Sequence, residues 1–92
     1  MKIEFDSAKN DKNIADRKLP FEQAANFDFN TAIVRQDVRN SYPEVRLVAF
    51  GFLDARLHVL CFTPIEGGLR VISFRKANPR EIKDYEQATS TH

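Results

Sequence analysis

The sequence predicts an α+β fold in which an antiparallel sheet of about five strands carries two N-terminal helices and one C-terminal helix. Helical patterns occur only before residue 31 and after residue 77. Between them, residues 31–75 follow the period-two alternation of strands, interrupted by short turn sequences. Helices and hairpin-linked strands that are segregated along the chain are typical of this class. A chain of 92 residues builds one core, so we expect a single domain over residues 1–92.

The chain should open with a short strand over residues 2–6, followed by a helix that runs to about Arg17. Asp6 or Ser7 can cap this helix, because either side-chain oxygen can accept a hydrogen bond from a free amide of the first turn. The helix is markedly polar. We expect a thin buried stripe made from its few apolar residues, Ala8, Ile14 and Ala15.

A second, short helix is predicted to begin at Pro20. Proline suits a first turn, since the amide hydrogen that it lacks would have no partner there. The residues expected to face inward are Phe21, Ala24, Ala25 and Phe27.

Four further strands are predicted at residues 31–36, 45–53, 56–63 and 69–75. A polar loop over 37–43 follows the first of them. Asp54-Ala55 and Gly67-Gly68 are the expected hairpin turns, of which the glycine pair is the stronger signal.

The last helix has the clearest start signal of the chain. Asn78 is the expected cap, Pro79 occupies the first helical position, and Glu81 completes a capping box three residues after the cap. Ile82 and Tyr85 are spaced to reach the sheet from one side of this helix.

Composition excludes several classes of function. The net charge of +1 is not that of a strongly basic nucleic-acid-binding domain. A single cysteine, Cys61, excludes an internal disulfide and a zinc cluster, and a buried inert thiol is its expected role. His58 is expected to be a partly buried structural histidine, and His92 is the last residue, so no metal site is predicted. The absence of a signal peptide or membrane span favours the cytoplasm.

Charged residues within the strands are the best candidates for chemistry. Glu44 and Arg46 are two apart and therefore share a face, as do Ser73 and Arg75, which we expect to lie beside Val71. Arginines and a hydroxyl on one sheet face would suit a phosphodiester. The alternative is a surface ion-pair network of little net energy.

Aromatic residues lie between these charges at positions 50, 52, 62 and 74, all of them phenylalanine. If these rings were exposed they would stack on bases, but a domain without tryptophan needs them for its core, so burial is the expectation.

Four short motifs, in this order and spacing, resemble the BrnT family, the toxin half of a bacterial type II toxin–antitoxin pair. They are Phe5-Asp6-Ser-Ala-Lys9-x-x-x-Asn13, Phe21-Glu22-Gln-Ala24, Glu44-x-Arg46 with Gly51 beyond it, and Ile72-Ser73-x-Arg75-x-Ala77 followed by Glu81 and Tyr85. The last motif is the most specific. Phe5 stands where the family usually has a tryptophan.

The resemblance implies a RelE-like fold and an endoribonuclease that inhibits translation without a metal or other cofactor. It also implies a small DNA-binding antitoxin of BrnA type, so that the toxin meets operator DNA only through this partner. Arg46 and Arg75 would contact the phosphate and the transition state, with Glu44 and Ser73 as weaker catalytic candidates and Glu44 as the acceptor of the 2′-hydroxyl proton. The expected RNA-binding residues are Lys9, Arg17, Arg56, Lys76 and Tyr85.

One departure from the family pattern bears on activity. Many members carry Lys-His-Gly before the second helix, where this chain has Asp16-Arg17-Lys18. Arginine cannot act as a general base at neutral pH, because its pKa is above about 12. The missing histidine and the near-neutral charge motivate an alternative, a catalytically weak or inactive homologue that acts as an antitoxin-binding and co-repressor module. A further alternative is an unrelated α+β domain whose similarity to the family arose by chance.

Overall fold

The computed structural model describes residues 1–90, so His92 lies outside it. Its elements are β1 (Lys2–Glu4), α1 (Ser7–Arg17), the 3₁₀ helix η1 (Phe21–Asn26), β2 (Ile33–Gln36), β3 (Leu47–Leu53), β4 (Arg56–Ile65), β5 (Gly68–Lys76) and α2 (Pro79–Thr89). The α+β class is confirmed. The second predicted helix is present as a 3₁₀ helix, which begins directly after Pro20 as its proline predicts.

The five strands form one sheet in the order β1-β5-β4-β3-β2. Neighbours from β2 to β5 are antiparallel, as expected for strands joined by hairpins and short loops. β1 instead pairs with β5 in parallel, so the sheet is mixed and the prediction of an antiparallel sheet was wrong for this strand. The reason is topological: β1 is separated from β5 by the rest of the fold and is not joined to it by a hairpin.

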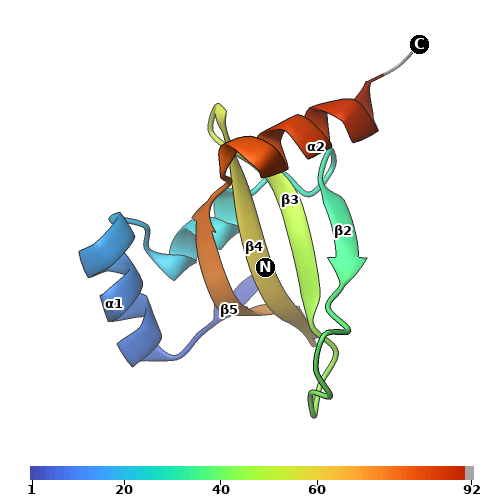
Figure 1. The fold of residues 1–92 in the computed structure, drawn as a ribbon. Coiled ribbons are helices and arrows are strands. Elements are labelled where there is room, and N and C mark those ends of the chain that lie inside the picture. The colour runs from blue at the N-terminus through green and yellow to red at the C-terminus, as the bar shows by residue number, and fades with distance from the viewer. Residues whose placement is uncertain (91–92) are drawn as a thin grey trace.

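Helices cover the two faces of the sheet (Figure 1). A hydrophobic cluster lies on each face. The larger cluster joins η1 and the segment after it to β3, β4 and β5, and it contains the fully buried Phe74 and Leu60. The smaller cluster lies under α2, where Tyr85 and Ile82 pack on Leu57, Val59 and Phe52. Phenylalanines serve both clusters. Phe62 and Phe74 are buried as expected, whereas Phe50 and Phe52, on the α2 side, are only partly buried.

A bulge in β5 decides which of its side chains face α2. Cys61 pairs with Ser73 but Phe62 pairs with Val71, which leaves Ile72 without a partner in the ladder. Val71 and Phe74 therefore both enter the larger cluster although they are three residues apart. Ser73 and Arg75 lie on the opposite face, so the prediction that Val71 shares their face was wrong. A bulge of this kind redirects the side chains that follow it.

Helix α1 is attached to the sheet by asparagines and not by an apolar stripe. Ala8, Ile14 and Ala15 are exposed, and the buried residues of α1 are Asn10 and Asn13, so the predicted stripe was wrong. The amide of Asn13 donates hydrogen bonds to the carbonyls of Leu19 at 2.9 Å and of Phe74 at 3.0 Å. These bonds dock α1 against the part of β5 that β1 does not cover.

The predicted turns and the start of α2 are confirmed. Asp54 and Gly67 have positive φ angles in the two hairpin turns. The capping box of Asn78 and Glu81 is complete, with each side chain bonded to the other residue's amide. Within residues 1–90, no helix is long and apolar enough to cross a membrane.

Candidate functional site

Helix α2 crosses only part of its face of the sheet (Figure 1). A hollow of about 490 Å³ lies on this face. We call it the arginine hollow. Its lining comes from β2 and the loop after it, the middle strands, the end of β5 and the start of α2: Arg35, Gln36, Asp37, Val38, Arg39, Val48, Phe50, Val59, Cys61, Ser73, Arg75 and Glu81. The lining thus combines three guanidinium groups and two carboxylates with valines, the Phe50 ring and a thiol.

Ser73 and Arg75 both line this hollow, and they share a face of the sheet as the sequence predicted. The bulge at Ile72 turns both toward the α2 face while Phe74, between them, fills the core behind. Ser73 is exposed and the side chain of Arg75 is 39% exposed, so both are accessible to a ligand.

Glu81 holds Arg75 through both of its carboxylate oxygens. The two guanidinium nitrogens donate at 2.8 and 2.9 Å, in the paired geometry that arginine also adopts with phosphate. The hydrogen bonds that Arg75 donates to Glu81 are the main cause both of the raised pKa of Arg75 and of the lowered pKa of Glu81. Arg75 is therefore held in place with its charge largely balanced by Glu81.

Asp37 orders the loop that carries Arg39. Its side chain is only 3% exposed and accepts hydrogen bonds from the backbone amide and the guanidinium of Arg39 and from the hydroxyl of Tyr42. The hydrogen bonds from Arg39 hold the pKa of Asp37 well below its usual range. This carboxylate is consequently ionised near neutral pH and fixes the direction of Arg39.

Arg46 and Glu44 do not line the arginine hollow. They line an adjoining one of about 380 Å³, and the two hollows share Gln36, Asp37 and Val38. The guanidinium of Arg46 lies 4.1 Å from the centre of the Tyr42 ring and bonds Glu44 at 3.3 Å. The predicted pair of Arg46 and Arg75 is therefore split between neighbouring hollows on one side of the sheet.

Several charged groups at this end of the sheet act on the pKa of the Cys61 thiol. Burial is the main cause of its raised pKa, and the Asp37 carboxylate adds to the rise. The positive charges of Arg46, Arg39 and Lys9 act in the opposite direction. Three cations from separate parts of the chain thus lie within electrostatic range of one thiol. Its raised pKa agrees with the inert role predicted for Cys61, although the side chain is only partly buried and not buried as predicted.

The predicted RNA-binding residues are more scattered. Lys9 is exposed on α1, and Arg17 at the end of α1 donates to Asn13 at 3.0 Å. Arg56 lines a hollow of about 630 Å³ beneath the second half of α2, away from Arg75. Lys76 pairs with His58 in the ladder and so lies on the opposite face from Arg75. Tyr85 is 8% exposed, and its hydroxyl donates to the Thr31 carbonyl at 2.7 Å.

His58 has the structural role that the sequence predicted. It is buried on the η1 side of the sheet, its ring lies 5.5 Å from that of Phe74, and Nδ1 is 2.8 Å from the Arg56 carbonyl oxygen. Burial lowers its pKa. Within residues 1–90, no group of three or more His, Cys, Asp or Glu side chains is placed to hold a metal ion.

Three residues of the arginine hollow were missed as functional candidates: Arg35, Arg39 and Glu81. Arg35 had a usable signal, because it alternates with Ile33 in a predicted strand and Ile33 packs under α2. Arg39 had none, since it lies in a loop. Glu81 was recognised as a cap, but its contact with Arg75 depends on where α2 starts relative to β5.

The chain was compared with known proteins. A family model described as "Ribonuclease toxin, BrnT, of type II toxin-antitoxin system" matches residues 5–81, which is most of the chain. No curated protein matches the chain. The matched region spans every residue of the arginine hollow. The chain therefore belongs to the BrnT family, the ribonuclease toxins of type II toxin–antitoxin systems.

Proposed function

We propose that the chain is an endoribonuclease that cleaves RNA in the arginine hollow without a metal ion. The observation that carries the proposal is the meeting of Arg35, Arg39 and Arg75 with the Ser73 hydroxyl around one open hollow. Guanidinium groups fit the non-bridging oxygens of a phosphodiester, and donors fixed in advance stabilise charge that develops in a transition state. The family assignment supports the same activity.

The proposed reaction uses the RNA's own 2′-hydroxyl as nucleophile. Its oxygen bonds to the adjacent phosphorus while its proton passes to a carboxylate, for which Glu44 in the adjoining hollow remains our candidate. The bond from phosphorus to the 5′-oxygen breaks, this oxygen takes a proton from water, and the hydroxide that remains takes the proton held by Glu44. The products are a 2′,3′-cyclic phosphate and a 5′-hydroxyl. Arg75 and Ser73 would hold the phosphate, and Arg46 would supply further charge. This reaction needs mainly orientation and charge stabilisation from the protein.

The proposal includes the cellular role that the family implies. The toxin would cleave RNA in the cytoplasm and inhibit translation, on a RelE-like fold. A small DNA-binding antitoxin of BrnA type would cover the site and carry the complex to operator DNA. The proposed RNA path runs past Lys9, whose charge acts on the Cys61 thiol of the hollow. Arg17 and Arg56 would bind RNA beyond the hollow, whereas Lys76 on the opposite face and the buried Tyr85 do not lie on this path.

One observation favours a second candidate, the non-catalytic antitoxin-binding and co-repressor module. Glu81 occupies both arms of the Arg75 guanidinium, so a phosphate would have to compete with a carboxylate that is already bound. Together with Arg17 at the usual histidine position, this arrangement would suit a toxin that has lost its activity and keeps its partner.

Incubation of purified, antitoxin-free protein with single-stranded RNA in excess EDTA separates the two candidates. The matched substrate is DNA of the same sequence, which lacks the 2′-hydroxyl. The nuclease proposal predicts RNA fragments ending in cyclic phosphate and intact DNA. Intact RNA at every protein concentration, with tight binding of the antitoxin retained, would support the module. Cleavage that EDTA abolishes would refute metal independence.

A further inference from the structure

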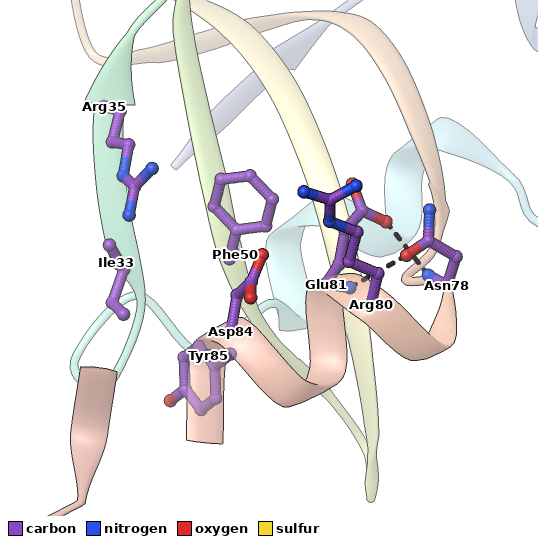
Figure 2. A pocket seen from close by; sticks show the side chains of 8 residues that line it. All are labelled: Ile33, Arg35, Phe50, Asn78, Arg80, Glu81, Asp84 and Tyr85. Carbon is purple, nitrogen blue, oxygen red and sulfur yellow. Dashed lines mark hydrogen bonds between the residues drawn. The ribbon is translucent and has the colours of Figure 1, made fainter. Parts of the chain in front are cut away.

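Another hollow, of about 420 Å³, adjoins the arginine hollow and lies between β2, β3 and the first turns of α2 (Figure 2). We call it the Phe50 hollow. It is lined by Ile33, Arg35, Phe50, Asn78, Arg80, Glu81, Asp84 and Tyr85. Arg35, Phe50 and Glu81 line both hollows. An RNA strand that crosses the arginine hollow therefore has a continuous path into this one.

The Phe50 hollow has an aromatic floor. Phe50 is partly buried and projects from β3 between β2 and α2 (Figure 2), with Ile33 and Tyr85 completing the apolar surface. Arg35 reaches over from β2 on one side of the ring and Arg80 from α2 on the other. An aromatic ring with cations beside it suits a flat, electron-rich ligand that is joined to phosphates, as a nucleobase is.

Asp84 gives the hollow a hydrogen-bond acceptor that has no partner among the described residues. Its carboxylate points from α2 toward the Phe50 ring (Figure 2). Within residues 1–90, no hydrogen bond or ion pair engages the side chains of Asp84, Arg35 or Arg80. Glu81 differs, because Arg75 and the Asn78 amide already occupy it. The free acceptor of this hollow is therefore the carboxylate of Asp84.

We propose that the Phe50 hollow is a nucleobase subsite that selects guanine next to the scissile phosphodiester. This inference rests on the proposed function, since it assumes that RNA lies in the arginine hollow. Guanine presents two donors side by side, N1–H and the N2 amino group, and an ionised carboxylate has two acceptors to match them. Adenine and cytosine place a ring acceptor beside their amino group, and uracil flanks its one N–H with carbonyls. Each of these three bases would bring an oxygen or nitrogen lone pair against Asp84.

The charges of the hollow agree with this assignment. Arg35 and Arg80 stand at its sides and can hold the phosphates that flank the base, which offsets the repulsion between these phosphates and Asp84. Stacking on Phe50 would accept any base, so selectivity depends on Asp84. The subsite therefore combines sequence-independent attraction with one base-reading group.

The test measures binding of oligonucleotides that cannot be cleaved, so that catalysis does not enter. Fluorescence anisotropy would follow 2′-O-methyl uridine hexamers carrying one central guanine, adenine, cytosine, inosine or 7-deazaguanine. We expect the guanine hexamer to bind about tenfold more tightly than the adenine, cytosine and all-uridine hexamers, as one well-placed paired contact gives. Inosine, which lacks the N2 amino group, should lose most of this preference. The 7-deazaguanine hexamer, whose altered N7 edge faces away from Asp84, should keep it.

Asp84→Asn is the diagnostic variant, because the amide keeps the shape and replaces one acceptor with a donor. It should bind all hexamers alike. Asp11→Asn is the matched control, since Asp11 is an exposed aspartate on α1 outside the hollow and its substitution changes the net charge equally. The control should keep the guanine preference.

The outcomes separate this inference from the proposed function. A protein that prefers guanine through Asp84 but cleaves no RNA keeps the subsite and refutes only the nuclease. A protein that cleaves RNA but binds all hexamers alike refutes the subsite. A guanine preference that survives Asp84→Asn refutes it equally.

Discussion

Arg75 at the end of β5 and Glu81 in the first turn of α2 form a paired ion bridge, with nitrogen–oxygen distances of 2.8 and 2.9 Å. The same Glu81 carboxylate accepts the Asn78 amide and so caps α2. One side chain therefore starts the helix and directs the arginine that we propose for phosphate binding. A phosphate that binds Arg75 must share it with Glu81 or displace Glu81 from it.

Replacing Glu81 with glutamine should tighten RNA binding severalfold, because the substitution removes the negative charge that competes with phosphate. The glutamine oxygen can still accept the hydrogen bond from the Asn78 backbone amide. The stability loss should therefore stay near 1 kcal/mol, the scale of an ion pair screened by solvent. Glu86→Gln, an exposed residue on the same helix, is the control. Unchanged or weaker RNA binding by Glu81→Gln would show that Glu81 assists Arg75 and does not compete for it.

Asn13→Ala should lower the free energy of unfolding by about 3 kcal/mol, since it leaves the buried carbonyls of Leu19 and Phe74 without donors. Asn26→Ala, an exposed asparagine in η1, should have little effect. Denaturant titration of both variants measures the difference. Equal stability would mean that α1 is held by other contacts.

Gly68→Ala should detach β1 from the sheet. A β-carbon at Gly68 would lie 1.8 Å from the Lys2 carbonyl oxygen. This oxygen is a backbone atom, so the clash cannot be relieved by moving a side chain. We expect a loss of about 3 kcal/mol, as for a badly overpacked site. Gly67→Ala is the comparison, because it meets no atom and bears only the cost of a positive φ, about 1 kcal/mol. If Gly68→Ala is no worse than Gly67→Ala in urea, the parallel pairing of β1 is wrong.

The buried His58 should make the protein less stable as the pH falls below about 6.5, the usual pKa of histidine in an unfolded chain. Burial lowers the pKa of His58 in the folded state, so the unfolded state binds the proton more readily. The contribution is fully present above that pH and is lost progressively below it. His58→Gln should flatten the dependence of the melting temperature on pH between about 6.5 and 5. A slope equal to that of the unsubstituted protein would assign this dependence to other groups.

Local signals predicted the elements of this fold well. The capping box at Asn78, the proline at position 20 and the glycine turn at 67 each state a backbone requirement directly, and all three are confirmed. The parallel pairing of β1 was not predictable in this way. The pairing depends on which edge strand of the sheet is left without a partner once β2 to β5 have paired. The residues next to β1 in the sequence do not determine this.

The candidate site was predicted only in part, for a related reason. Ser73 and Arg75 share a face by simple alternation, and the structure agrees. The bulge at Ile72, however, depends on pairing with β4. The sequence contains one sign of it, because the apolar residues Leu69, Val71 and Phe74 change from a spacing of two to a spacing of three. Residues of the loop before β3, such as Arg39, reach the site through the bonds of Asp37, which periodicity does not describe.

The most direct test of the account compares Arg75→Ala with Arg70→Ala. Both residues are arginines of β5 in ion pairs, but Arg70 bonds Glu4 at 3.2 Å beside β1 and lies outside the arginine hollow. Each variant would be assayed for RNA cleavage and growth inhibition, with thermal unfolding to establish that it folds. We expect Arg75→Ala to fold but to lose both activities, and Arg70→Ala to keep them. Full activity in a folded Arg75→Ala protein would contradict it.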